Sequence, residues 1–191
     1  MVSSGMLDAS LLLPERPRPL KRAEYDRLVA LGAFEDERVE LLHGVLVGMS
    51  PNNPGHVSPI DRLNMILAPA LLGKAIVRVQ SPLSAHDESE PEPDVAIVAL
   101  GDYRKQHPAA ALLVIEVALS SLNKDRNVKA PLYAASGFGE YWIVNVAEKV
   151  IEVHRAPAGG RYGAVTCHAI GESVTPEAFP GILVSVAEVF G

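Results

Sequence analysis

The segments "PDVAIVAL" (residues 93–100) and "ALLVIEVAL" (residues 111–119) decide the fold of this chain. Both are apolar at nearly every position, which is typical of central strands that are covered on both faces of a sheet. Each segment carries one carboxylate, Asp94 in the first and Glu116 in the second. An acid inside such a strand is rare unless it is paired or binds a metal ion. The two segments therefore predict a buried central sheet and, if the strands are neighbours, a site where two carboxylates meet.

Helical and strand patterns alternate along the rest of the chain. Apolar residues recur at helical spacing over 20–31 and 56–72, and a further helix, interrupted by Pro131, is expected over 122–136. This order predicts a mixed α/β (α+β) domain whose central mixed sheet is flanked by helices, with additional antiparallel strands. The other expected strand segments are 38–50 (a hairpin that turns at His43-Gly44), 74–84, 140–146, 149–156, 161–170 and 179–191, the last with a short helix.

Length and composition fit one globular domain. The 191 residues are 48% hydrophobic and 21% charged, which allows a sizeable core. We expect a single domain over 20–191, preceded by an N-terminal arm over 1–19. No run of roughly 18 apolar residues occurs, so no membrane span is expected, and the N-terminus lacks the basic start of a signal peptide. The single cysteine, Cys167, excludes an internal disulfide framework, so we expect a cytoplasmic protein in which Cys167 is buried in a strand.

Net charge limits the kind of nucleic-acid contact that the chain can make. It has 17 Lys and Arg residues against 23 acids, a formal net charge of −6. Proteins that hold nucleic acid by bulk charge are basic. A DNA contact would therefore be metal-assisted or confined to one face of the molecule.

The acid pair Asp94 and Glu116 has two interpretations. Two carboxylates a few ångströms apart repel each other, and a hard divalent cation removes that repulsion. Mg²⁺ binds one or two carboxylates, a carbonyl and several waters, and such a site suits phosphodiester hydrolysis. In the alternative, Asp94 caps a strand end and Glu116 pairs with a buried Arg or Lys. The neighbouring acids Glu90 and Glu92 are expected to face solvent.

Basic residues follow the Glu116 strand directly. Lys124, Arg126 and Lys129 lie within six residues of one another, and a lysine in this place can orient an attacking water or stabilise charge on a phosphate. The alternative is a solvated helix face on which Asp125 and Lys129 form an i, i+4 pair.

Four segments together resemble a known family. "RVELLHGVLVGMSPNNPGH", "PEPDVAIV", "LLVIEVALSS" and "DRNVKAPLYAASGFGEYWIVNV" are similar, in order and spacing, to the bacterial Uma-two family of endonucleases. That family belongs to the restriction-endonuclease-like superfamily, which is named for its PD-(D/E)xK motif. The resemblance runs from about Glu40 to Val146. It implies a mixed sheet flanked by helices and Mg²⁺-dependent cleavage of DNA.

The resemblance also implies roles for individual residues. Asp94, in the PD element, and Glu116 would be metal ligands, and the carbonyl of Val117 would be a third. Glu40 resembles the first acid of the family, which would complete the metal shell. Gln80 and His56 resemble residues that line the site.

The motif lysine is displaced in this chain. It should stand two residues after Glu116, where this sequence has Ala118. Lys129 is the best substitute, because it would project from the next helix toward the same pocket, and Lys124 is the second choice.

Three functions remain open at this point. The first is an endodeoxyribonuclease that uses Mg²⁺ or Mn²⁺. The second is a member of the fold with little or no catalysis, which acts as an interaction module for nucleic acid or protein. The third is a metal-dependent hydrolase with another substrate. Exposed strand edges after residue 139 would let two chains pair, so we expect a homodimer.

Overall fold

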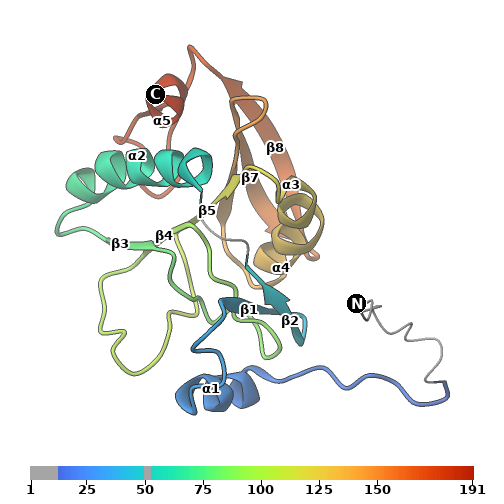
Figure 1. Ribbon diagram of the computed structural model, residues 1–191. Coiled ribbons are helices and arrows are strands. Elements are labelled where there is room, and N and C mark those ends of the chain that lie inside the picture. The colour runs from blue at the N-terminus through green and yellow to red at the C-terminus, as the bar shows by residue number, and fades with distance from the viewer. Residues whose placement is uncertain (1–12, 50–52) are drawn as a thin grey trace.

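The computed structural model describes residues 13–49 and 53–191, and everything predicted for residues 1–12 and 50–52 lies outside this range. A six-stranded sheet forms the centre of the fold (Figure 1), in the order β3-β4-β5-β6-β7-β8. Strands β5 and β6 run parallel, and all other neighbours in this sheet are antiparallel. The strands are Ile76–Val79 (β3), Val95–Val98 (β4), Leu113–Ala118 (β5), Glu140–Asn145 (β6), Val150–Ala158 (β7) and Arg161–Ala169 (β8). The predicted fold class is confirmed.

Smaller elements surround this sheet. Two short antiparallel pairs lie beside it, Val39–Leu42 (β1) with Val45–Gly48 (β2), and Ser173–Val174 (β9) with Val184–Ser185 (β10). The helices are Arg22–Ala30 (α1), Pro54–Ala70 (α2), Leu122–Lys124 (α3), a π-helical turn Asp125–Lys129 (η2), Ala130–Ala135 (α4) and Val186–Phe190 (α5). No helix in the described part of the chain has the length and apolar character needed to cross a membrane.

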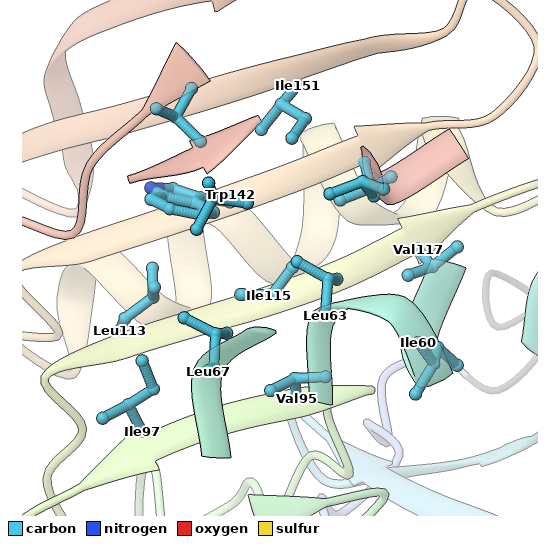
Figure 2. Close-up of a cluster of buried hydrophobic side chains, with 14 of the residues drawn as sticks. Ile60, Leu63, Leu67, Val95, Ile97, Leu113, Ile115, Val117, Trp142 and Ile151 are labelled. Atoms are coloured by element: carbon cyan, nitrogen blue, oxygen red, sulfur yellow. The ribbon is translucent and has the colours of Figure 1, made fainter. Parts of the chain in front are cut away.

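Helix α2 covers one face of the central sheet. It begins at the cap residue Asn53, whose side chain accepts a hydrogen bond from the backbone N–H of His56. Its apolar stripe packs on alternate residues of β4 and β5 (Figure 2), with all of these side chains at most 3% exposed. Each such burial stabilises the fold by about 1.5–3 kcal/mol. The residues in this contact are Ile60, Leu63 and Leu67 with Val95, Ile97, Leu113 and Ile115.

The segment from α3 to α4 covers the opposite face. Since side chains alternate along a strand, the other residues of β4 and β5 point to this face. Ala96, Val114 and Ala118 are buried there among Tyr133 and Tyr141. By the same alternation Asp94 and Glu116 lie on this face too, so both acids lie beneath the helical segment rather than beneath α2.

The helix predicted over 122–136 is divided by a π-helical turn. The N–H of Ala130 bonds to the carbonyl of Asp125, five residues back. Pro131 has no N–H to donate, which removes one bond of the ordinary α-helical pattern at this point. Single π-turns of this kind are frequent at functional sites.

The β1–β2 hairpin is tied to the loop before β4. Leu41 and Glu90 exchange backbone hydrogen bonds of 3.3 and 2.8 Å. The turn is at His43-Gly44, as predicted, with φ of 50° and 76°. A side chain at Gly44 would come within 2.3 Å of Pro19 Cβ, so the close approach of residues 19 and 20 requires glycine. This docking carries Glu40 of β1 toward the central sheet.

Two predicted exposures are wrong. Cys167 is exposed rather than buried, because most residues of the edge strand β8 are left uncovered on both faces by the described part of the chain. Glu90 is only 5% exposed, because the hairpin and α1 close over it. The Glu90 error arises from contacts between segments far apart in the sequence, whereas the Cys167 error arises because no other segment covers this part of β8 within the described residues.

Candidate active site

Strands β4 and β5 bring the two acids together. Their register pairs Val95 with Ile115, and one step further along this register sets Asp94 opposite Glu116. The residues are 7% and 5% exposed. The condition set by the sequence, that the two strands be neighbours, is therefore met.

Asp94 is held in place by two donors. Its Oδ2 accepts a hydrogen bond of 2.7 Å from the backbone N–H of Val117, and its Oδ1 lies 3.0 Å from Nε2 of His56. The hydrogen bond with Asp94 raises the pKa of His56, and the backbone of Val117 adds to this effect. The N–H of Gln80 donates to the main-chain oxygen of Asp94 at 3.0 Å. The carboxylate is therefore fixed from the β5 side and from α2.

Glu116 has a cation and a hydroxyl as partners. Its Oε1 accepts from Nζ of Lys129 at 2.8 Å and from the hydroxyl of Tyr133 at 2.7 Å. Burial raises the pKa of Glu116 to about 8, and Asp94 and Asp125 add to this shift, while Lys129 opposes it. A group that neutralises this cluster of acids would therefore stabilise the ionised form of Glu116.

Lys129 bridges two acids. Besides Glu116, its Nζ lies 2.9 Å from Oε2 of Glu40, and the lysine is 2% exposed. Burial alone would lower the pKa of Lys129, but Glu116 and Glu40 together raise it above its ordinary value. The ammonium is therefore protonated at neutral pH and can donate a hydrogen bond but cannot accept a proton.

Both carboxylate oxygens of Glu40 are engaged by lysines. Oε1 accepts from Nζ of Lys124 at 2.9 Å, while Oε2 contacts Lys129 and accepts at 3.2 Å from the N–H of Glu92. Burial would raise the pKa of Glu40, but the two lysines lower it overall. Glu40 thus shares the ammonium of Lys129 with Glu116 and lines the same pocket.

The candidate side chains line one pocket. Among the described residues, no three or more His, Cys, Asp or Glu side chains are grouped so that they could hold a metal ion. What the pocket offers is two converging carboxylates, whose oxygens are hard donors of the kind that Mg²⁺ binds together with water. Val117 contributes backbone atoms beside this pocket, and Ala118 does not line it. The lining residues predicted from the sequence are Glu40, His56, Gln80, Asp94, Glu116, Lys124 and Lys129.

The sequence analysis missed Asp125 and Tyr133. Asp125 also lines the pocket and is 1% exposed, so the solvated-face interpretation of the Asp125–Lys129 pair is wrong. Its Oδ2 accepts from Oγ of Ser121 at 2.5 Å, whereas its Oδ1 is buried with no hydrogen-bond partner among the described residues. The i, i+4, i+8 spacing of Asp125, Lys129 and Tyr133 was the available signal, because such residues share a helix face.

The whole arrangement lies inside a region that matches a family model. Residues 22–187 match the model for Uma2, described as "Putative restriction endonuclease". The chain belongs to the Uma2 family. The resemblance seen in the sequence is confirmed, and all the candidate site residues of this Uma2 chain fall within the matched region.

A solved structure has the same fold. The Uma2 chain is similar to the crystal structure of a "putative nuclease belonging to DUF820" from Anabaena variabilis, with a TM-score of 0.67 and 14% sequence identity. The match covers 90% of this chain and 98% of the other. No curated protein matches this chain.

Proposed function

We propose that this Uma2 protein is a metal-dependent endonuclease that hydrolyses phosphodiester bonds of DNA. The family supports a nuclease in general terms. The observation that carries the finer proposal is the convergence of Asp94 and Glu116 in one pocket with the protonated side chain of Lys129. Acids that hold a cation beside a fixed ammonium are suited to a substrate on which negative charge develops.

The metal ligands in this proposal are the carboxylates of Asp94 and Glu116 and the carbonyl of Val117. Mg²⁺ or Mn²⁺ bound there would lower the pKa of a water and offset charge on the phosphate. The unpartnered Oδ1 of Asp125, in the wall of the same pocket, supports a cationic or water-donating occupant, because a buried carboxylate oxygen without a partner is costly.

The remaining side chains of the pocket orient the metal ligands or donate hydrogen bonds to the phosphate. The Val117 N–H and His56 fix the orientation of Asp94. Lys129 stabilises charge on the phosphate as a hydrogen-bond donor, in place of the motif lysine that is absent at Ala118. Glu40 holds Lys129 in position. Lys124, whose side chain is 33% exposed, is placed at the pocket to meet an incoming phosphate.

A cleavage assay tests this function. Purified protein should nick supercoiled plasmid DNA with Mg²⁺ or Mn²⁺ and stop when EDTA is added. Asp94→Asn, which keeps the shape of the side chain, should reduce the rate by at least about 100-fold, and Asp102→Asn, at an exposed acid that pairs with Arg104, should leave it unchanged. Asp94→Asn protein that is folded by circular dichroism and still cleaves at the wild-type rate would refute the assignment.

The second function is an interaction module without catalysis. The observation in its favour is that the ammonium of Lys129 already contacts both Glu116 and Glu40 without a metal ion. Calorimetry with Mn²⁺ distinguishes the nuclease from the interaction module. The nuclease should bind Mn²⁺ at millimolar concentration and lose this binding in Asp94→Asn, whereas the module should show no such binding.

Three further predictions accompany this function. Residues 20–191 form a single domain with residues 1–19 as an arm. Two chains form a homodimer, for which the free edge of β8 is the available strand. The protein resides in the cytoplasm.

A further inference from the structure

A second pocket lies on the other side of the helical segment that carries Lys129. Figure 1 shows α3 and α4 lying against β7 and β8, and the pocket is formed between these elements. Asp125 and Lys129 face the candidate active site, whereas the residues between and just after them face the second pocket. The lining residues are Arg126, Asn127, Ala130, Pro131, His154, Arg161 and Tyr162.

The lining of this pocket is basic in an acidic protein. Two arginines and no acid line it, although the whole chain carries a net charge of −6. Arg126 is fixed by Glu152, with Nε 3.1 Å from Oε2 and Nη2 2.5 Å from Oε1, so its remaining nitrogen is held in a set direction. Within the described residues, the Arg161 side chain has no hydrogen bond or ion pair. The pocket thus holds one preorganised guanidinium and one unpaired guanidinium.

His154 adds a buried donor without a partner. It is 8% exposed, and its Nε2 has no hydrogen-bond partner among the described residues. Nε2 lies 3.6 Å from Oε2 of Glu152, which is too long for a hydrogen bond. The ring is packed between Tyr141 and Tyr162, at centroid distances of 5.5 and 5.8 Å. Nε2 is shielded from solvent, so a ligand oxygen that accepts from Nε2–H would satisfy this atom once the neighbouring side chains shift to admit it.

We propose that this second pocket binds one phosphate group of a nucleic-acid strand while another phosphate of the same strand enters the candidate active site. Guanidinium groups match phosphate oxygens in shape and charge, and a neutral imidazole N–H supplies one further donor. The inference rests on the nucleic-acid substrate of the proposed function. It also gives this acidic chain a local basic surface at which to hold a polyanion.

The spacing of the two pockets fits one strand of nucleic acid. They are separated by one helix, and a helix with its side chains is about 10 Å across. Along one strand of duplex DNA the phosphates rise by about 3.4 Å each, so a phosphate about three positions from the scissile one can span this distance. The source of the phosphate is either a backbone diester or a terminal monoester, since both present the same oxygens.

Binding of short oligonucleotides in EDTA tests the proposal without cleavage. The probes are one single-stranded oligonucleotide with a 3′ fluorophore and a 5′ hydroxyl, and the same sequence with a 5′ phosphate, each followed by anisotropy. Arg161→Gln should weaken binding about tenfold. It should also reduce the slope of log K against log salt concentration by about one, because one phosphate contact is lost. His154→Phe, which keeps the packing between Tyr141 and Tyr162, should weaken binding severalfold. Arg27→Gln, on α1 and lining neither pocket, is the matched control and should bind as the wild type does.

The outcomes distinguish a backbone diester from a terminal phosphate as the bound group. They also test the phosphate pocket separately from the nuclease function. An effect of Arg161→Gln on both probes assigns the pocket to a backbone diester, and an effect only on the 5′-phosphorylated probe assigns it to a terminal phosphate. Equal affinity of Arg161→Gln and wild type for both probes, or no binding of either probe by wild type, overturns the inference. If Arg161→Gln weakens binding while the wild type cleaves no DNA with metal, the phosphate pocket stands and the nuclease assignment fails.

Discussion

The ammonium of Lys129 lies 2.8 Å from the carboxylate of Glu116, although Lys129 is on a helix and Glu116 on the strand beneath it. In the motif that the sequence resembles, a lysine would stand two residues after Glu116, where this chain has Ala118. Ala118 faces the same side of the sheet as Glu116 and packs beneath Ala130 and Tyr133. The helical segment above Ala118 therefore brings the ammonium group of Lys129 next to Glu116, although the strand itself carries no lysine there.

Replacing Lys129 should affect both activity and stability. Lys129→Gln leaves Glu116 buried without its cation, and removing one partner of a buried ion pair costs about 3–5 kcal/mol. DNA cleavage should fall by at least about 100-fold, since a fixed donor to the phosphate is lost. Plasmid nicking and urea denaturation measure the two effects, with Lys105→Gln on an exposed loop as the control. Wild-type cleavage by folded Lys129→Gln protein would remove the lysine from the mechanism.

Glu40 should control turnover rather than metal binding. Both of its oxygens are occupied by lysines, so Glu40→Gln should leave the affinity for Mn²⁺ unchanged while lowering kcat by about 100-fold, because Lys129 is no longer held in position. Calorimetry gives the affinity and single-turnover cleavage gives the rate. A large loss of Mn²⁺ affinity would show instead that Glu40 is a metal ligand.

Mn²⁺ binding should strengthen as the pH rises. Burial raises the pKa of Glu116 to about 8, and a protonated carboxyl does not bind a metal ion. Each pH unit below that value should therefore weaken Mn²⁺ binding by about tenfold, with a plateau above it. His56 also titrates beside Asp94, so the measurement is repeated in His56→Gln, where the slope near pH 8 should persist. A flat profile from pH 6 to 8.5 would contradict the pKa assigned to Glu116.

Glu90 should make the fold less stable at neutral pH than at pH 5. Burial raises its pKa to about 7, and Asp26 adds to the shift. The folded state therefore holds the proton more tightly than the unfolded state, so the free energy of unfolding decreases as the pH rises from about 4.5 to about 7. Glu90→Gln should remove this decrease and be more stable than wild type at pH 8, as followed by urea denaturation. The exposed acid Glu35, replaced by Gln, provides the comparison, and it should reproduce the wild-type curve.

The sequence predicted those parts of the site that depend on strand patterns. Two apolar runs were enough to place Glu116 on a buried strand and Asp94 at the start of another, because a strand covered on both faces leaves a distinctive composition. Their meeting required the strand order, which no local pattern contains. The family resemblance supplied the role of Lys129, which the charges alone left open.

The errors concern residues buried by distant segments. Asp125 was interpreted as part of a solvated helix face, but it lies in the pocket wall because its segment crosses the sheet above the two acids. Glu90 was expected in solvent, but the β1–β2 hairpin and α1, from much earlier in the chain, cover it. The place of Glu40 in a metal shell stays a prediction, and the contacts of its carboxylate with two lysines were not foreseen from the sequence.

The parallel pairing of β5 and β6 has a consequence for how the protein folds. Parallel neighbours need a crossover connection, and this one, between Ala118 and Glu140, contains the helical segment with Lys129. Closing that loop has an entropic cost that must be met before the strand contacts form, so the pairing is a slow, non-local step. The cation reaches Glu116 in the same step that completes the sheet. Before β5 and β6 pair, Lys129 is therefore not yet held beside Asp94 and Glu116. The site is assembled together with the cooperative fold.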